Sequence, residues 1–347
     1  MNKAEVSQVR EGLNVKLSKC CKEAITSLAL GGTGKQKIET KMIEQILTRK
    51  NLLQAMYKVQ KNHGSAGVDY MPVTKLSELM SIDKEELTAK VRSGKYLPQA
   101  ILGVEISKGE GKTRLLGIPT VTDRLLQQAV LQVITARFEY EFSYSSFGFR
   151  PNRNVQQAVL KAQGYINDGF QNIVDIDLKT FFDEVDHCYL LQLLYRKIKC
   201  RETLCLIRKW LRSPIQINGK LVKRRKGVPQ GSPLSPLLSN IMLHELDREL
   251  EKQGLKFIRY ADDFVITAID KQTITNHIIP LVKAFLAERG LELSPEKSKI
   301  THINQGFNFL SQNVRKYKGK LLIHPSKEAV QSFKNKIKKL FRENRGI

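Results

Sequence analysis

The sequence predicts an α+β fold in which strands and helices follow one another without a regular strand–helix–strand repeat. Between Thr122 and Phe142 apolar residues recur at the spacing of a helix, whereas residues 172–178 alternate and are rich in β-branched side chains, as in a strand. The chain has 347 residues, of which 41% are hydrophobic. This is enough for a large core and suggests two or three domains or subdomains.

The first half of the chain predicts helices on both sides of a long hairpin. Gly31-Gly32-Thr33-Gly34 is typical of a loop between two helices, and the basic tip Lys108–Lys112 interrupts an extended stretch, as the turn of a β-hairpin does. In chain order, we expect helices over 1–30 and 40–62, a hairpin over 101–118, helices over 122–142 and 155–167, and a strand within 172–178 that ends at Asp177.

The second half predicts shorter helices and several hairpins. Asn218-Gly219 is a strong two-residue turn signal between extended segments, and two apolar runs flank residues 260–263 in the same way. We expect helices over 187–198 and 201–212, a hairpin over 214–226, a helix over 233–251, a hairpin over 256–267, a helix over 272–289, strands over 298–303 and 307–323, and a last helix over 326–342.

The chain is strongly basic. Its formal net charge is +24, from 58 basic and 34 acidic residues. So large an excess indicates a polyanionic partner, and nucleic acid is the first candidate. An anionic membrane surface is the alternative, but no apolar run is long enough to span a bilayer, and the N-terminus lacks the apolar region of a signal peptide. Five scattered cysteines without C-x-x-C spacing predict reduced thiols. We therefore expect no membrane partner and a cytoplasmic location.

The C-terminal helix is predicted to be amphipathic. From Arg315 to Ile347 there are eleven basic residues against two acidic ones, Glu328 and Glu343. We expect its apolar stripe to pack on another element and its lysines to face solvent or phosphate. The sequence then stops without a closing element, which suggests a truncation within a longer protein. The stripe consists of Val330, Phe333, Ile337, Leu340 and Phe341.

Three aspartates carry the strongest chemical signal. Asp177 ends a predicted strand, and Asp262 and Asp263 are expected in the turn of a hairpin. Paired carboxylates are costly unless a cation lies between them. Such a triad can hold two Mg²⁺ ions about 4 Å apart and promote phosphoryl transfer. The neighbouring polar residues that nothing pairs with this triad, and that we interpret as structural, are Asp183, Asp186 and His187.

Several motifs resemble those of the reverse transcriptases (maturases) encoded by bacterial group II introns. Tyr260-Ala261-Asp262-Asp263 resembles the Y-x-D-D box of reverse transcriptases, and residues 227–240, which begin Gly227-Val228-Pro229-Gln230-Gly231, resemble the motif that precedes it. The other matches, in the family's order from about residue 40 to the end, are Arg114 to Arg124, Phe147-Gly148-Phe149-Arg150-Pro151 and Asp177 to His187.

The resemblance implies a right-hand polymerase fold with fingers and palm but without most of the thumb. The expected divisions are an N-terminal helical extension (1–39), fingers (40–170, with 210–230 contributing), a palm (171–310), and the end of the palm with the start of the thumb (311–347). Ser311 stands where the family usually has the glycine of a Phe-Leu-Gly primer-grip turn, which puts the turn geometry in question. With so little thumb, DNA synthesis by this chain is expected to be weak.

The resemblance also implies roles for individual residues. Asp177, Asp262 and Asp263 correspond to the catalytic residues that hold two Mg²⁺ ions, or Mn²⁺ in their place, with the Leu178 carbonyl as a further metal ligand. Phe182 corresponds to the aromatic side chain that excludes a ribose 2′-hydroxyl, which leaves Phe181 for the core. The positions that correspond to nucleotide contacts are Lys108, Arg114, Phe182, Gln230 and Lys297, and those that correspond to template or RNA contacts are Arg150, Gly231 and Ser232.

The function that the resemblance implies is RNA-directed DNA synthesis in the retrohoming of a group II intron. The partners would be dNTPs, an RNA template with a DNA primer, and the intron RNA, whose splicing the protein would assist. One alternative is a chain that acts only as an RNA-binding splicing cofactor. Another is a domesticated relative, such as a CRISPR-associated reverse transcriptase. We expect a monomer or dimer that acts at the bacterial nucleoid.

Overall fold

The structure is a computed structural model that describes residues 36–109, 112–296 and 298–344. The helix expected over 1–30 and the loop after it lie outside the described residues. The chain forms two compact units, unit 1 (Met1–Phe142, Thr180–Leu243 and Ala287–Leu291) and unit 2 (Ser143–Lys179, His244–Leu286 and Glu292–Ile347). The division into fingers, palm and thumb rests on the resemblance and stays a prediction.

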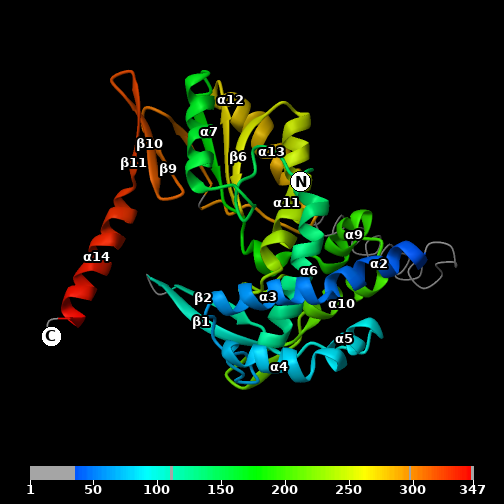
Figure 1. Cartoon of the computed structure of the whole chain (residues 1–347). Helices are drawn as coiled ribbons and strands as arrows, with labels where there is room; N and C mark the ends of the chain where they lie inside the picture. Colours follow the sequence, from blue (N-terminus) through cyan, green and yellow to red (C-terminus); the bar gives the residue numbers. More distant parts are fainter. Residues whose placement is uncertain (1–35, 110–111, 297, 345–347) are drawn as a thin grey trace. The chain divides into compact units, whose positions relative to one another are not determined.

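Unit 1 is built around helix α6 (Val121–Glu139), whose side chains are buried on most sides. Helices α2 (Gln36–Leu47) and α3 (Arg49–Lys61) pack against it (Figure 1). A helix that is buried on most sides belongs in a core, so α6 is the centre of this unit. Its other helices are η1 (Val73–Lys75), α4 (Leu76–Ile82), α5 (Lys84–Arg92), α8 (Phe181–Glu184), α9 (His187–Lys197) and α10 (Arg201–Arg212), with the start of α11 (Ser235–Lys252).

Thr48 divides the helix expected over 40–62 into α2 and α3. Its backbone is extended, with ψ 143°, and its hydroxyl accepts a hydrogen bond from the Asn51 N–H as the N-cap of α3. The Asn51 side chain donates in turn to the Ala129 carbonyl of α6 at 3.0 Å. A local N-cap therefore makes the corner, and a contact with a distant helix, which the local pattern does not reveal, supports it.

The sheet of unit 1 has the order β2–β1–β4–β5. Strands β1 (Ile101–Gly109) and β2 (Lys112–Ile118) are antiparallel, which confirms the hairpin expected over 101–118. Strand β4 (Ile215–Ile217) pairs parallel with β1 and antiparallel with β5 (Lys220–Val222). Asn218 and Gly219 between them have φ 48° and 78°, as the predicted two-residue turn requires.

The main sheet of unit 2 has the order β6–β7–β3–β8, with every neighbouring pair antiparallel. Helix α7 (Val155–Asn167) packs against β6 (Figure 1), and its buried residues join side chains of the sheet in one hydrophobic cluster. This confirms the predicted strand before Asp177 and the hairpin over 256–267. The strands are β3 (Asn172–Ile176), β6 (Lys256–Tyr260), β7 (Asp263–Ala268) and β8 (Lys299–His302).

The helix expected over 272–289 is interrupted by a π-helical segment. It consists of α12 (Lys271–Thr273), the π-helix η2 (Ile274–Ile278) and α13 (Ile279–Ala287). The Ile279 N–H donates to the Ile274 carbonyl, one residue further back than in an α-helix. Pro280 follows directly; it has no N–H and its ring crowds the preceding turn, so regular α-helical bonding cannot continue through it.

A second sheet of unit 2, with the order β11–β10–β9, precedes the C-terminal helix. Its strands are β9 (Phe307–Phe309), β10 (Gln312–Tyr317) and β11 (Lys320–Pro325). Leu310 and Ser311 form the turn between β9 and β10 with φ 50° and 67°. The turn is therefore made with a serine in the left-handed conformation that favours glycine.

Helix α14 (Lys327–Glu343) has no buried residue. Phe333, in the middle of the predicted apolar stripe, is 63% exposed. The expectation that the stripe packs on another element is therefore wrong for the part of the chain that the structure describes. Within the same residues, no helix is both long enough and apolar enough to cross a membrane.

Candidate active site

Asp262 lies in the tight turn between β6 and β7, and Asp263 is the first residue of β7. The turn consists of Ala261 and Asp262, because Tyr260 pairs directly with Asp263. Ala261 has φ 60°, a left-handed conformation that costs an alanine about 1–2 kcal/mol. The turn thus contains one of the two aspartates that were expected in it, and the surrounding structure must hold it in this strained form.

A buried ion pair supports this turn. The Nε and Nη2 atoms of Arg259, in β6, donate to the two carboxylate oxygens of Asp247, in α11, at 2.8 and 2.6 Å. Its Nη1 atom donates to the Ala261 carbonyl at 3.0 Å. Both side chains of the pair are fully buried. Because an unpaired buried charge costs several kcal/mol, the bidentate pair fixes the guanidinium and, through it, the turn.

Gly148 brings a loop of unit 2 against the same turn. The Phe147 N–H donates to the Arg259 carbonyl, and the Arg259 N–H donates to the Ser145 carbonyl, both at 2.8 Å. The loop therefore runs beside β6. A Cβ atom on Gly148 would lie 2.2 Å from the Ala261 nitrogen, so only glycine permits this approach.

Arg150, predicted to contact the template, braces this loop from within. Its Nη1 atom donates to the carbonyls of Ser143 and Ser146 at 2.6 and 2.7 Å, and the residue is only 8% exposed. A guanidinium held in this way has a structural task already, so its position gives the predicted template contact no support.

Asp177 follows β3 directly and lies on the same face of the main sheet as Asp263. Asp175 of β3 pairs with Val265 of β7. The last pair of this ladder is Ile176–Phe264, and the same register continued by one residue sets Asp177 beside Asp263. Side chains alternate between the faces of a sheet, so Asp175 shares this face as well. Asp175 was not among the predicted site residues, although its spacing of two from Asp177 indicated a shared sheet face.

These three carboxylates repel one another. Burial, followed by the charges of Asp263 and Asp177, raises the pKa of Asp175 to about 6, while Lys299 on the neighbouring strand lowers it. A bound cation relieves such repulsion, and carboxylate oxygens are the ligands that Mg²⁺ prefers. The residues therefore fit a divalent metal chemically. Among the described residues, no group of three or more His, Cys, Asp or Glu is arranged to hold a metal ion.

In unit 1, the structure brings together Arg114 of β2 and Gln230. The Arg114 Nε atom donates to the side-chain oxygen of Gln230. The Gly117 N–H donates to the Gln230 carbonyl at 2.7 Å, which ties this loop to β2. Gly231 has φ 120°, and a Cβ atom there would lie 2.6 Å from the Gly117 carbonyl oxygen. Gly231 is therefore required for packing the loop, whatever contact it makes with RNA.

Phe182 is tied to the same loop of unit 1. The Val228 N–H donates to the Phe182 carbonyl at 2.7 Å. The rings of Phe181 and Phe182 meet edge to face with centroids 5.5 Å apart. Phe181 is 2% exposed and Phe182 is 9% exposed. Phe182 is thus bonded to the loop that contains Gln230, and its action on the sugar stays a prediction.

Three further residues have structural partners within unit 1. Asp186 caps α9 by accepting from the Tyr189 N–H at 2.7 Å, and His187 Nε2 bonds the Gly227 carbonyl at 2.7 Å. The structural interpretation of both residues is confirmed. The Ser232 hydroxyl, which was predicted to face RNA, is buried and donates to Gln127 of α6 at 2.8 Å.

The remaining predicted contacts are placed only in part. Lys297 lies outside the described residues. Lys108 belongs to β1 at a point where the register with β2 shifts, as at a β-bulge. Leu178 is buried and forms an isolated bridge with Leu293 in unit 2, and the metal contact of its carbonyl stays a prediction.

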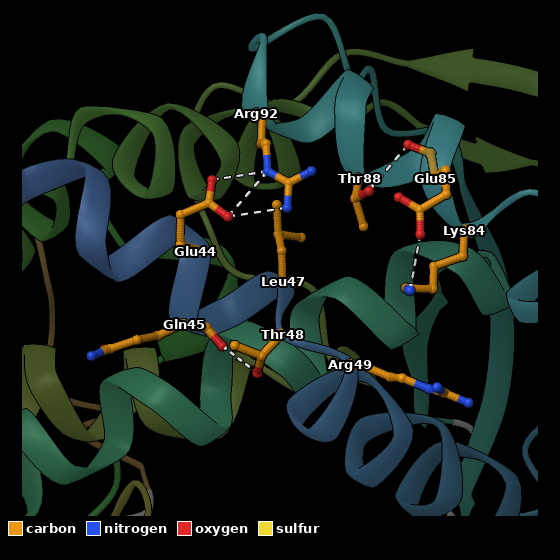
Figure 2. A pocket seen from close by; sticks show the side chains of 9 residues that line it. All are labelled: Glu44, Gln45, Leu47, Thr48, Arg49, Lys84, Glu85, Thr88 and Arg92. Carbon is orange, nitrogen blue, oxygen red and sulfur yellow. Dashed lines mark hydrogen bonds and ion pairs between the residues drawn. The ribbon is translucent and has the colours of Figure 1, made fainter.

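A pocket of unit 1, between the α2–α3 corner and α5, contains none of the predicted site residues (Figure 2). Arg92 donates to both carboxylate oxygens of Glu44 from Nε and Nη2, at 2.8 and 3.0 Å, and Lys84 pairs with Glu85 at 3.0 Å. These charges neutralise one another across the pocket. Arg49 adds one further cation to the lining.

Comparison with known proteins gives one consistent family. Residues 106–314 match the family described as reverse transcriptase (RNA-dependent DNA polymerase). Protein YkfC of Escherichia coli (strain K12) is 30% identical over 295 residues, which cover 73% of this chain and 77% of that protein. The group II intron-encoded protein LtrA of Lactococcus lactis subsp. cremoris is 31% identical over 296 residues, which cover 67% of this chain and 49% of LtrA. The chain thus spans about half the length of LtrA.

A solved structure supports the fold alone. Telomerase from Candida albicans, in complex with a fragment of telomeric RNA, matches with a TM-score of 0.54 and 14% identity. The match covers 74% of this chain and 50% of the telomerase chain. Together with the family match, this confirms the expected polymerase fold and the resemblance to the intron-encoded enzymes.

Proposed function

Since the chain belongs to the reverse transcriptase family of RNA-dependent DNA polymerases, we propose that it synthesises DNA on an RNA template for a group II intron. The observation that carries the chemistry is the placement of Asp177 beside Asp263 on one sheet face, next to the braced turn that holds Asp262. The intron context rests on the likeness to LtrA. Intron RNA, an RNA template with a DNA primer, and dNTPs are the proposed partners.

Reverse transcriptases use divalent metal ions. We propose that Asp177, Asp262 and Asp263 hold two Mg²⁺ ions here, with Asp175 adding negative charge behind them. When bound, the ions would lower the pKa of the primer 3′-hydroxyl and neutralise the charge on the pyrophosphate that leaves. The protein would fix the positions of these carboxylates. Arg259 and Gly148 support the turn that contains Asp262, and the strand register sets Asp177 beside Asp263.

We propose that two residues of unit 1, Arg114 and Gln230, bind the incoming nucleotide. Phe182, in the same unit, would exclude nucleotides that carry a ribose 2′-hydroxyl. Arg114 is an exposed guanidinium, which suits a triphosphate, and its bond to Gln230 preorganises both side chains. The backbone bond from Val228 fixes Phe182 relative to this loop.

The test is primer extension on an RNA template by Asp262→Asn and Asp177→Asn proteins. Each substitution keeps the side-chain volume and removes a charged ligand. We expect each to lower the rate by about 10³-fold, which corresponds to several kcal/mol of lost transition-state stabilisation. Circular dichroism and thermal unfolding would confirm that both proteins fold.

Asp168→Asn is the matched control, because Asp168 is an exposed carboxylate at the C-terminal end of α7 in the same unit. It should extend the primer as the parent protein does. Folded Asp262→Asn protein that still makes DNA at the parent rate would show that the carboxylates do not carry the reaction.

A further inference from the structure

The β10–β11 hairpin of unit 2 has two different faces. Val314, Leu321 and Ile323 pack on the hydrophobic cluster that includes α7. Alternation places Arg315, Tyr317, Lys320 and Leu322 on the opposite face, where Arg315 pairs with Leu322 and Tyr317 pairs with Lys320. All four residues are exposed. We call these four residues the outer hairpin face.

The outer hairpin face exposes an aromatic ring between cations. Tyr317 is 54% exposed and Leu322 is 47% exposed. The guanidinium carbon of Arg315 lies 6.0 Å from the centre of the Tyr317 ring, and Lys318 Nζ lies 5.7 Å from it. Because more than half of the tyrosine surface stays accessible, neither cation covers the ring. An apolar surface with cations at its rim offers stacking and charge together.

Arg315 is held in place by the loop before β9. Its Nε atom donates to the Asn304 carbonyl at 2.9 Å. Its aliphatic stem lies so close to Gly306 that a Cβ atom there would come within 2.8 Å of the Arg315 Cβ. Gly306 has φ 81°, which also favours glycine. The guanidinium is thus positioned before any ligand arrives, which reduces the entropy lost on binding.

The charge of the residues around the outer hairpin face favours a polyanionic ligand. No Asp or Glu occurs between Glu296 and Glu328, whereas Lys318 and Lys320 adjoin the ring at the hairpin turn. Glu328 accepts a hydrogen bond from Asn308, at the other end of the sheet face. The basic character is therefore concentrated at the hairpin end, where the tyrosine lies.

We propose that the outer hairpin face binds single-stranded nucleic acid, with one base stacked on Tyr317 and the flanking phosphates bound by Arg315, Lys318 and Lys320. A sheet that presents an exposed aromatic ring among cations suits unpaired bases, because every base has a face that can stack. The proposal goes beyond the polymerase activity. None of these residues belongs to the candidate active site, and binding requires neither dNTPs nor a divalent ion.

The test is fluorescence anisotropy of the whole chain with a labelled single-stranded RNA of about ten nucleotides, a length within the range that such surfaces bind. EDTA is present throughout. We expect Tyr317→Thr, which keeps the β propensity and removes the ring, to weaken binding by about 5- to 100-fold, as the loss of one stacked base does. Tyr317→Phe should bind within about twofold of the parent protein, because the ring remains.

Two further variants separate positioning from stacking. Gly306→Ala should also weaken binding, since it displaces Arg315 while it leaves the ring intact. Tyr57→Ala is the matched control: Tyr57, on α3, is 63% exposed and has Lys61 Nζ 6.0 Å from its ring centre. This control should bind as the parent does. The affinity for a DNA oligonucleotide of the same sequence shows whether the surface binds RNA alone or binds both RNA and DNA.

Photocrosslinking with an oligonucleotide that contains 5-iodouridine, followed by mass spectrometry, should label the peptide that contains Tyr317. Asp262→Asn protein should bind the oligonucleotide as the parent does although it extends a primer about 10³-fold more slowly, so failure of this proposal is distinguishable from failure of the polymerase proposal. Equal affinity of Tyr317→Thr and parent protein, with no crosslink to the hairpin, would overturn the inference. So would a Tyr317-dependent affinity for anionic lipid vesicles in place of the oligonucleotide.

Discussion

Phe181 and Phe182 offer a paired test of nucleotide selection. They are adjacent phenylalanines, but Phe182 is expected to select the sugar of the nucleotide and Phe181 to pack in the core. We predict that Phe182→Val lowers the preference for dNTPs over rNTPs by about 10- to 100-fold, since removal of the ring relieves a clash with the ribose 2′-hydroxyl. Single-nucleotide incorporation with each substrate measures this preference. Phe181→Val should lower the stability and leave the preference unchanged. Equal discrimination by both variants would assign Phe182 to the core.

His187 gives unit 1 a dependence on pH. Burial, more than any other cause, lowers the pKa of His187 below its ordinary value, and its Nδ1 atom has no hydrogen-bond partner among the described residues. The unfolded chain therefore takes up a proton near pH 6.5 that the folded protein resists. The contribution of His187 to the free energy of unfolding is fully present above that pH, and it is lost as the pH falls towards the lowered pKa of the folded protein.

We predict that the urea midpoint of the parent protein falls between about pH 7.5 and about pH 5.5, and that it falls less in His187→Gln, whose amide can donate to the Gly227 carbonyl without titrating. Urea unfolding followed by circular dichroism at both pH values measures the difference. A parallel decline in both proteins would mean that His187 makes no contribution to the pH dependence.

Among the elements, the loop that contains Gly148 and the turn that holds Asp262 are matched to each other. We predict that Gly148→Ala destabilises unit 2 by about 1–3 kcal/mol, because the added methyl group meets the backbone of Ala261. Gly164→Ala is the control. Gly164 lies near the C-terminal end of α7, and no atom outside its chain neighbours and the backbone of the helix lies within 4 Å of the added Cβ, so the substitution should stabilise by about 0.5–1 kcal/mol. Thermal unfolding of both variants decides whether the close approach matters.

Most elements with a regular apolar pattern were predictable from the sequence. The hairpins over 101–118 and 256–267 and the helix α7 follow local patterns, and the structure contains them. Helices α4 and α5 were not predicted: both are short, and their polar residues obscure the buried positions. The contact of Asn51 with α6, which supports the break at Thr48, and the exposure of α14 among the described residues are not contained in any local pattern.

The candidate site shows the same division. Asp177, Asp262 and Asp263 could be named because their motifs are local, whereas the supports of the site come from elsewhere in the chain. Arg259 looks like one charged residue in an apolar strand, and its partner Asp247 lies in a helix twelve residues earlier. Asp175 required the strand register, which shows that its carboxylate shares a face with Asp263. Pairings of this kind are properties of the folded chain.

For the whole molecule, the net charge of +24 predicts binding that depends strongly on salt. Each phosphate neutralised by a basic residue releases a counterion, so the logarithm of the association constant should fall linearly with the logarithm of the salt concentration, by about 0.7 per phosphate on single strands. We predict that affinity for single-stranded RNA falls more than about tenfold between about 50 and 200 mM salt. Anisotropy titrations across this range measure the slope. An affinity that does not respond to salt would contradict a phosphate-dominated interface.

The order in which the two units occur along the chain has a consequence for synthesis on the ribosome. Unit 2 begins at Ser143, before unit 1 is complete, and unit 1 receives its last segment, Ala287–Leu291, only after most of unit 2 has been made. Domains that are continuous in sequence can fold one after another as they emerge. Here neither unit has all of its residues before Leu291 has been made. Neither unit can therefore complete its native fold before much of the other unit has been synthesised.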